Sequence, residues 1–163
     1  MKELWQFELD RAAALDSKRL SMGESYLGEG ETYVNWALWL MEQGVTEESV
    51  QILAVLRAPL SRWEVESWLN RVIFALGLAA PNPERFRYEY ARELARRTVA
   101  GGLSPAVGTR ALWQEYVRLD YDEQLLTVAY LDDCLEQGEP VEAILQELQA
   151  FLDTLPEPSL VEK

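Results

Sequence analysis

The densest group of chemically capable side chains lies in the segment "LDDCLEQGEPVE", residues 131–142. Its acids, together with one just upstream, fall on or near one arc of a helical wheel: Asp122, Asp132, Asp133, Glu136 and Glu139. Oxygen ligands of this kind bind Ca²⁺ or Mg²⁺ in proteins. The spacing is not that of an EF-hand loop, and a chain without histidine cannot form the Glu-x-x-His motif of di-iron helical sites. A negative face for a basic protein partner needs a high density of acidic side chains but no fixed spacing. The sequence is therefore compatible with a cation site, a partner-binding face or a solvated surface.

Two other patterns are weaker candidates for chemistry. The glycine-rich segment 21–31 lacks the Gly-Lys-Ser/Thr of a phosphate-binding loop, and its glutamates would repel a phosphate. Cys134 has no histidine anywhere in the chain to activate it, and it falls among apolar helix positions, as a small buried side chain does. We therefore expect no catalytic residue, no bound metal and no cofactor.

The charge of the chain is unevenly distributed. The net charge is −13, and residues 119–163 carry twelve acids and one base, a net of −11, against −2 for residues 1–118. An acidic chain repels phosphate backbones, so nucleic-acid binding is disfavoured. A basic protein partner suits such a surface.

The sequence has one cluster of basic side chains, at Arg85, Arg87, Arg92, Arg96 and Arg97. On a helix, Glu93 and Arg97 are four residues apart and Glu89 and Arg92 are three apart, spacings at which opposite charges pair. The sequence therefore predicts a solvated, paired face here, with an anion-binding patch as the alternative.

An apolar helix is predicted over residues 32–43, and one of its tryptophans lies among polar side chains. Trp39 shares its arc with Asn35, Glu42 and Gln43. Either a neighbouring loop covers Trp39, or this side chain is a partner contact, since tryptophan is enriched in interface hot spots. In the helix from Arg62, Trp63 occupies the first turn, where an apolar side chain is expected to staple the helix start.

Helix signals dominate the whole chain, and no segment shows the alternation of a strand. Thr46, Ser61 and Ser104 precede helical segments as N-caps, and further helices are expected over residues 83–100 and from about 122 to 137. We predict an all-α protein, a compact single-domain bundle of about eight helices over residues 1–155, followed by a flexible tail over 156–163. The core should include two side chains from each of four predicted helices: Trp36, Leu40, Trp68, Val72, Leu112, Tyr116, Ile144 and Leu148.

The sequence also allows a prediction of the cellular location of the protein and of its contact with membranes. The longest stretches without charge have twelve residues and are broken by proline or glycine, whereas a membrane span needs about 20 apolar residues. The single cysteine excludes an intrachain disulfide, and the basic start and apolar stretch of a secretory signal are absent. We expect no membrane contact and a cytoplasmic location.

The segment "YVNWALWLMEQGVTEESVQILAVL" resembles a pattern in small, uncharacterised bacterial proteins, in which an Asn-Trp-Ala helix precedes a Ser-x-x-Ile-Leu-Ala helix. The block "YLDD", residues 130–133, resembles a second shared feature. The likeness covers about a fifth of the chain, and Val55 stands where such proteins usually have glycine. It implies an α-helical bacterial protein and a toxin–immunity gene neighbourhood, and it transfers no catalytic residue.

These observations favour a non-enzymatic binding protein of the immunity or inhibitor type, which presents an acidic face to a basic partner. Its expected partner-binding residues are the five acids named above and Trp39. A carboxylate, metal-dependent enzyme and a self-associating structural or adaptor protein are the alternatives. The identity of the partner and the oligomeric state are open.

Overall fold

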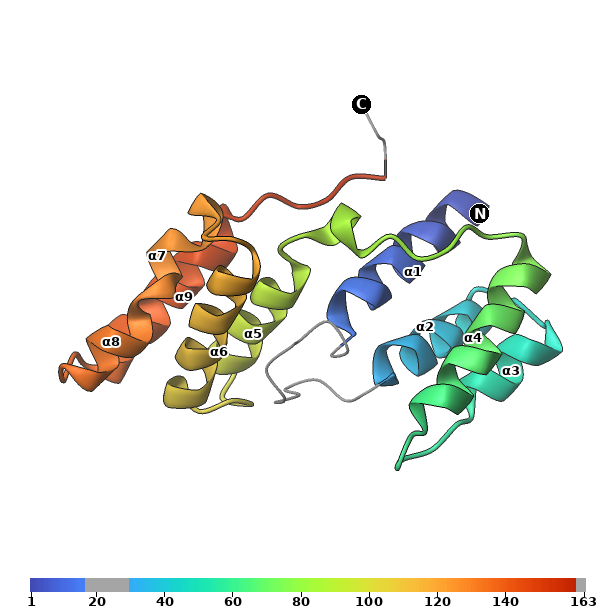
Figure 1. The fold of residues 1–163 in the computed structure, drawn as a ribbon, viewed down its shortest axis with the longest axis horizontal. Helices are drawn as coiled ribbons and strands as arrows, with labels where there is room; N and C mark the ends of the chain where they lie inside the picture. Colours follow the sequence, from blue (N-terminus) through green and yellow to red (C-terminus); the bar gives the residue numbers. More distant parts are fainter. Residues whose placement is uncertain (17–29, 161–163) are drawn as a thin grey trace. The chain divides into compact units, whose positions relative to one another are not determined.

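A computed structural model describes residues 1–16 and 30–160, and all regular structure in these residues is helical (Figure 1). The prediction of an all-α protein with about eight helices is confirmed. The loop predicted over residues 21–31 lies almost wholly outside the described residues. The chain divides into two compact units: residues 1–87 with residues 158–163 form unit 1, and residues 88–157 form unit 2. The predicted single domain over 1–155 and the predicted tail over 156–163 stay predictions.

The described residues of unit 1 form four α-helices and a short 3₁₀ helix: α1 Lys2–Leu15, α2 Glu31–Glu42, α3 Glu48–Ala54, α4 Arg62–Leu76 and η2 Pro83–Phe86. Helix α3 packs against both α2 and α4, and α1 packs against α2 and η2. Leu9, Leu40, Leu53 and Val72 come from four different helices and are all completely buried or nearly so. The predicted cap of α4 is confirmed, because Ser61 Oγ accepts a hydrogen bond from the backbone N–H of Glu64 at 3.4 Å.

A buried carboxylate attaches the η2 segment to α1 in unit 1. Asp10 is 3% exposed and accepts hydrogen bonds from the Asn82 backbone N–H at 2.8 Å and the Gln6 amide at 3.0 Å. The Phe7 and Phe86 rings meet edge to face beside it, with centroids 4.8 Å apart. The burial of both groups holds residues 82–86 against α1.

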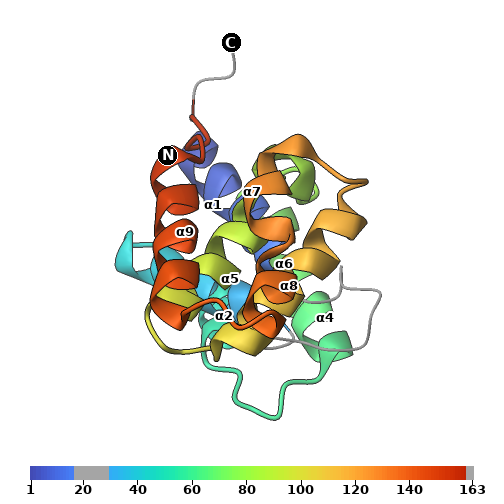
Figure 2. The ribbon, with the colours of Figure 1, turned by 90° about the vertical axis from the view of Figure 1, so that its left-hand side faces the viewer.

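Unit 2 contains the remaining helices: α5 Glu89–Val99, α6 Pro105–Arg118, η3 Glu123–Leu125, α7 Leu126–Ala129, α8 Leu131–Glu136 and α9 Val141–Thr154. Helix α5 packs against α6 and α9, and α7 and α8 both contact α6 and α9; Figure 2 gives a second view of these helices. The start of α6 is the predicted one. Ser104 Oγ accepts from the Val107 N–H at 3.2 Å, and Pro105 occupies the first turn, where its missing N–H costs nothing.

Two helices predicted as continuous are interrupted. The helix expected over 83–100 breaks at Tyr88, whose φ of −101° and ψ of 2° leave the helical range, so Phe86 is buried in unit 1 and α5 begins anew in unit 2. The helix expected from about Asp122 to Gln137 becomes η3, α7 and α8, with a break at Tyr130. In both places tertiary burial overrides a continuous helical pattern.

Local predictions in unit 1 were wrong at three positions. The N-cap of α3 is Glu47, with no side-chain cap bond, instead of Thr46. Trp63 does not staple the start of α4, because it is 79% exposed. Trp68 is half-buried at the edge of the core, with the Arg71 guanidinium 4.4 Å from its ring centroid, whereas the other seven residues expected in the core are buried.

No helix within the described part of the chain is both long enough and apolar enough to cross a membrane.

Truncating Leu148 tests the core of unit 2. Leu148 on α9 is completely buried, so replacing it with alanine removes apolar contacts and leaves a cavity. We expect Leu148→Ala to lower the free energy of unfolding by about 2–5 kcal/mol in chemical denaturation. Val141→Ala on the same helix, where the side chain is 45% exposed, is the control and should cost much less. Equal losses for the two variants would contradict this packing.

Gly108 tests the contact between α5 and α6. A Cβ atom at this position would lie 1.9 Å from Thr98 Oγ1, and Thr98 is buried with its hydroxyl donating to the Leu94 carbonyl at 2.7 Å. Gly108→Ala should therefore destabilise the protein by about 1–3 kcal/mol, because the two helices must separate. At Gly102 a Cβ meets only ordinary contacts, so Gly102→Ala should change thermal stability far less. A harmless Gly108→Ala would show that the helices are further apart.

Candidate functional site

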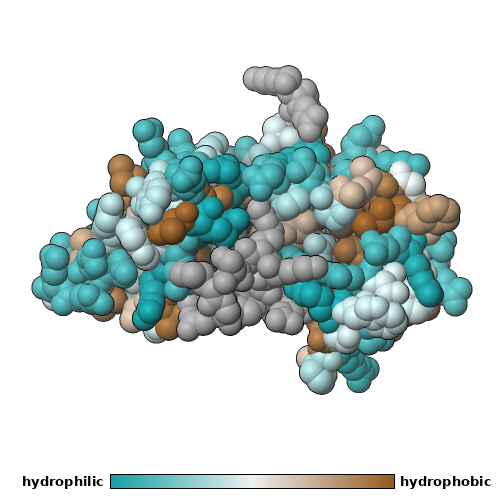
Figure 3. Space-filling view, viewed as in Figure 1, coloured by the Kyte–Doolittle hydropathy of each residue, from teal (hydrophilic) through white to brown (hydrophobic). Residues whose placement is uncertain are grey.

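Four of the predicted partner-binding acids lie on α8 and in the turn that follows it, with Asp132 and Asp133 in the first turn of the helix. Gly138, with φ 90°, reverses the chain after α8, and the Glu139 N–H donates to the Cys134 carbonyl at 3.1 Å. We call Asp132, Asp133, Glu136 and Glu139 the acidic corner. Three of them are exposed and Asp132 is half-buried. This end of unit 2 is hydrophilic at the left-hand edge of Figure 3.

The acidic corner has no neutralising partner in the described part of the chain. No described arginine or lysine lies within ion-pair distance of its four carboxylates. Asp132 Oδ1 accepts a hydrogen bond from the Asp133 backbone N–H at 2.9 Å, a local contact at the start of α8. The negative charge at this corner therefore faces solvent unbalanced, which costs the fold some self-repulsion.

Asp122 has a different role from the acids of the corner. Its Oδ1 accepts from the Gln124 N–H at 2.9 Å and caps η3, and its Oδ2 accepts from the Tyr88 hydroxyl at 2.9 Å. Both oxygens are thus used within unit 2, so the structure gives this carboxylate a positioning function in the fold.

Trp39 belongs to unit 1 and the predicted acids belong to unit 2. Its side chain is half-buried and packs against the core of unit 1. This packing favours the interpretation in which neighbouring segments cover Trp39. The tryptophan of unit 1 that does face solvent is Trp63.

The ion pairs predicted on α5 are present, but the prediction that all of its arginines are solvated is wrong for Arg92, which is buried. Arg96 and Arg97 both bind Glu93, at 2.8 and 3.0 Å, and Arg92 contacts Glu89 at 3.4 Å. Arg92 is only 4% exposed, and it also donates to the Glu157 carboxylate and to the Pro156 carbonyl, each at 2.8 Å. This side chain therefore ties the residues after α9 to α5.

A further ion pair is buried on α6. Glu115 is fully buried, and both of its oxygens accept hydrogen bonds from the Arg118 guanidinium, Oε2 at 3.0 Å. A buried carboxylate without such a partner would be strongly destabilising. The charge of Arg118 is therefore used inside unit 2.

The carboxylates of the described residues do not converge on a cation. Within residues 1–16 and 30–160, no group of three or more Asp, Glu, Cys or His side chains is close enough to hold a metal ion. Asp132, Asp133 and Glu136, the acids considered for a carboxylate enzyme, form no such group.

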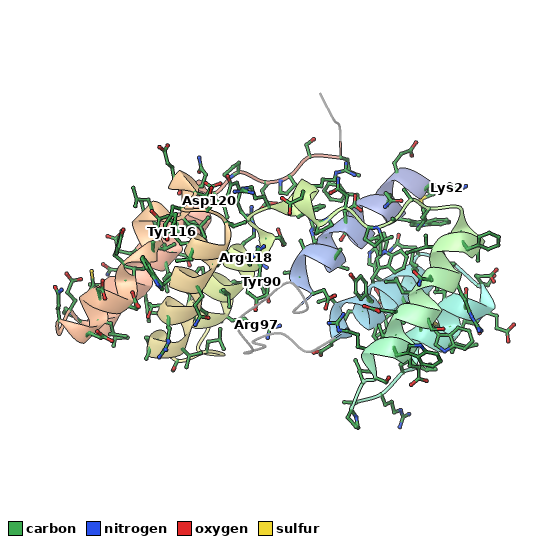
Figure 4. The ribbon with its side chains drawn as sticks, viewed as in Figure 1. Lys2, Tyr90, Arg97, Tyr116, Arg118 and Asp120 are labelled. Atoms are coloured by element: carbon green, nitrogen blue, oxygen red, sulfur yellow. The ribbon has the colours of Figure 1, made fainter. Side chains whose placement is uncertain are left out.

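Sequence reasoning missed an aromatic group in unit 2. The rings of Trp113, Tyr116, Tyr121 and Tyr130 form one connected set, and we call it the aromatic patch. Centroid distances are 5.4 Å for Trp113–Tyr130 and for Tyr116–Tyr121, and 5.7 Å for Trp113–Tyr116. Figure 4 shows Tyr116 and Arg118 on opposite sides of α6, with Tyr116 on the side toward α7. Trp113 and Tyr116 are three residues apart on α6, which was a usable signal, but Tyr130 comes from a distant segment.

The environment of the aromatic patch affects the acidity of Tyr116. Burial raises the pKa of this hydroxyl above its ordinary value, and the nearby Tyr130 hydroxyl, Tyr121 and Glu123 raise it further. Side chains from three different segments, Tyr121, Glu123 and Tyr130, therefore influence the Tyr116 hydroxyl, and the negative charge of Glu123 is one of these influences.

Unit 1 has a pocket of about 320 Å³ between α3 and α4. It is lined by two acids at the start of α3, by apolar side chains and by the stacked Arg71–Trp68 pair: Glu47, Glu48, Ser49, Ile52, Trp68, Arg71 and Ala75. The Arg71 cation already occupies a face of the Trp68 ring, so the pocket's most distinctive binding feature is used by the chain itself.

Comparisons of this chain with protein-family models, with curated proteins and with solved structures found no match.

The two roles of the predicted acids can be separated by stability measurements. Asp122→Ala removes the cap of η3 and leaves the Tyr88 hydroxyl without this acceptor, so we expect a loss of about 1–2 kcal/mol in the free energy of unfolding. Glu139→Ala is the matched control, because this side chain is exposed and makes no such bond, and it should change stability by less than about 0.5 kcal/mol. Comparable losses of stability in both variants would contradict the assignment of a structural role to Asp122 and a solvent-exposed position to Glu139.

Proposed function

We propose that this chain is a non-enzymatic binding protein whose acidic corner docks a basic protein partner. The observation that carries the proposal is the contrast in ion pairing within unit 2. Four of the five arginines of unit 2 pair with glutamates of the same unit, and the fifth, Arg110, is exposed without such a pair among the described residues: the paired ones are Arg92, Arg96, Arg97 and Arg118. The four acids of the corner face solvent with no described cation beside them.

Such a surface acts first on the rate of association. An unbalanced negative region attracts a basic partner over distances of about a Debye length, roughly 8–10 Å in physiological salt, and orients it before contact. Rim charges of this type govern the on-rate and its salt dependence more than the off-rate. The proposed mechanism is therefore electrostatic steering followed by steric occlusion of the partner's basic site.

In its most specific form, the proposal describes an immunity-type or inhibitor protein of a bacterial cytoplasm, with a toxin or enzyme as the occluded partner. The resemblance of residues 33–56 to small bacterial proteins supports this version, as does the low cysteine content, which suits a reducing compartment.

Self-association is a second candidate, and a separate surface favours it. Trp63 and Phe74 on α4 are 79% and 89% exposed, and their spacing of eleven residues places them on one stripe of the helix. Exposed aromatic side chains on one face are typical of protein contacts. This surface lies in unit 1 and is independent of the acidic corner.

The experiment neutralises the corner while preserving shape, with the variant Asp132→Asn, Asp133→Asn, Glu136→Gln and Glu139→Gln. Partners captured from a lysate of the native organism are identified, and the association of the purified partner is measured at two salt concentrations. We expect a basic partner whose on-rate falls about 10-fold or more in this variant at low salt, with a flatter salt dependence and a smaller change in off-rate.

The matched control removes the same number of negative charges from exposed acids of unit 1, by substituting Glu3, Glu42, Glu47 and Glu48 with Gln. It should bind nearly as the parent protein does. An acidic partner, or an on-rate equally affected by both variants, would overturn the proposal. A concentration-dependent mass in sedimentation that disappears in Trp63→Ser with Phe74→Ser would favour self-association instead.

A further inference from the structure

The aromatic patch offers ring surface to solvent. Tyr121 is 57% exposed and Tyr130 is 46% exposed, while Trp113 is half-buried and Tyr116 is buried beneath them. The Tyr121 ring meets Tyr116 edge-on, at an interplanar angle of 83°. The two exposed rings, Tyr121 and Tyr130, pack against the less exposed rings of Tyr116 and Trp113, and this packing fixes their positions.

The backbone at the end of α6 is strained where it delivers Tyr121. Asp120 and Tyr121 have φ values of 56° and 59°, and in the described chain they are the only residues other than glycine with positive φ. Four other helices, α2, α4, α5 and α8, make the corresponding turn with glycine: Gly44, Gly77, Gly101 and Gly138. Side chains other than glycine are disfavoured in this conformation, and tyrosine more than aspartate. A hydrogen bond stabilises this strained conformation, in which the Tyr121 N–H donates to the Tyr116 carbonyl at 2.9 Å.

The patch lacks the cations that cover aromatic rings elsewhere in the chain. In unit 1, Arg11 and Arg85 lie over Phe7, and Arg71 lies over Trp68, at 4.4–5.2 Å from the ring centroids. Among the described residues of unit 2, no arginine or lysine lies over a ring of the patch. Aromatic faces attract cations electrostatically, and guanidinium groups also stack on them.

A carboxylate follows Tyr121 closely in the chain. Glu123 is exposed at the start of η3, two residues after Tyr121, and its negative charge helps to raise the pKa of Tyr116 in the same patch. An exposed acid so near the uncovered tyrosine ring in sequence suits a positively charged, planar group.

We propose that the aromatic patch receives an arginine side chain of the partner, with its guanidinium stacked on Tyr121 and Tyr130 and paired with Glu123. The inference rests on the proposed function in one respect, the basic nature of the partner, and it names the side chain that is recognised. The acidic corner steers association, and the patch supplies a short-range contact that distinguishes arginine from lysine, because only guanidinium is planar and weakly hydrated.

The test uses the full chain, labelled with ¹⁵N, and a tetra-arginine amide peptide as the probe, with tetra-lysine amide for comparison. We expect tetra-arginine to shift the indole N–H signal of Trp113 and the backbone signals of Tyr121 and Tyr130, and tetra-lysine to bind about 3-fold more weakly at these signals. Tyr130→Phe keeps a ring and should bind tetra-arginine nearly as the parent does.

Tyr130→Leu keeps apolar bulk without a ring and should weaken tetra-arginine about 3-fold at the patch. The matched control is Phe74→Leu, the same type of change at an 89% exposed site in unit 1, and it should have no effect. Glu123→Gln provides a second variant at an exposed position, so the test does not depend on how Tyr130→Leu folds. It should weaken both peptides.

NMR shifts confined to Asp132, Asp133, Glu136 and Glu139, with equal affinity for both peptides, would contradict arginine binding at the aromatic patch. That result would still agree with the proposed role of the acidic corner. Weaker tetra-arginine binding at the patch in Tyr130→Leu and in Glu123→Gln, together with unchanged partner kinetics on neutralising the corner, would support arginine binding at the patch and reject steering by the corner.

Discussion

The structure depends on one electrostatic constraint, that each carboxylate taken out of water needs a cation or several donors. Four buried acids meet it with an arginine each: Asp10 with Arg85, Asp16 with Arg62, Glu89 with Arg92 and Glu115 with Arg118. The Asp16–Arg62 pair, at 2.8 Å, joins the end of α1 to the start of α4, and hydrogen bonding to Asp16 raises the pKa of Arg62. The Asp10–Arg85 and Asp16–Arg62 pairs connect elements that local helix preferences alone would leave independent, whereas the other two pairs lie within α5 and α6.

The same constraint shapes the surface of unit 2. Four of its five arginines pair with Glu89, Glu93, Glu115 and Glu157, and one of these four, Arg92, is itself buried. The fifth, Arg110, is exposed and forms no ion pair with a described residue. Residues 119–163 add twelve acids and only Lys163. The negative charge of the corner is therefore not balanced within unit 2, and its self-repulsion is the physical ground for proposing a partner.

In the proposed binding mechanism, the acidic corner and the aromatic patch act over different distances. Charge acts at long range and tolerates many geometries, so an exposed corner at a helix turn suffices for it. Stacking acts at van der Waals distance and requires fixed rings. The edge-to-face contact of Tyr121 with Tyr116 and the left-handed turn at Asp120 supply that fixity in unit 2.

The sequence by itself determined the features that depend on a few neighbouring residues. Ser61 and Ser104 cap their helices as predicted, and Glu93 pairs with Arg97, because the atoms involved are separated by one helical turn. The exposed acids of the corner were also foreseeable, since charged side chains clustered at a helix end are rarely buried without partners.

Only the tertiary structure decided the rest. The break at Tyr88 arises because Phe86 and α5 are buried in different units, and Asp122 turned inward because Tyr88 lies beside it. Likewise, the rings of Trp113 and Tyr130 are in contact although they come from separate helical segments, and Trp63 stays exposed while Trp36 is buried. Helical periodicity predicts which side chains share a face of a helix. The segment that packs against that face is set by contacts between residues far apart in the chain, and local sequence patterns do not identify it.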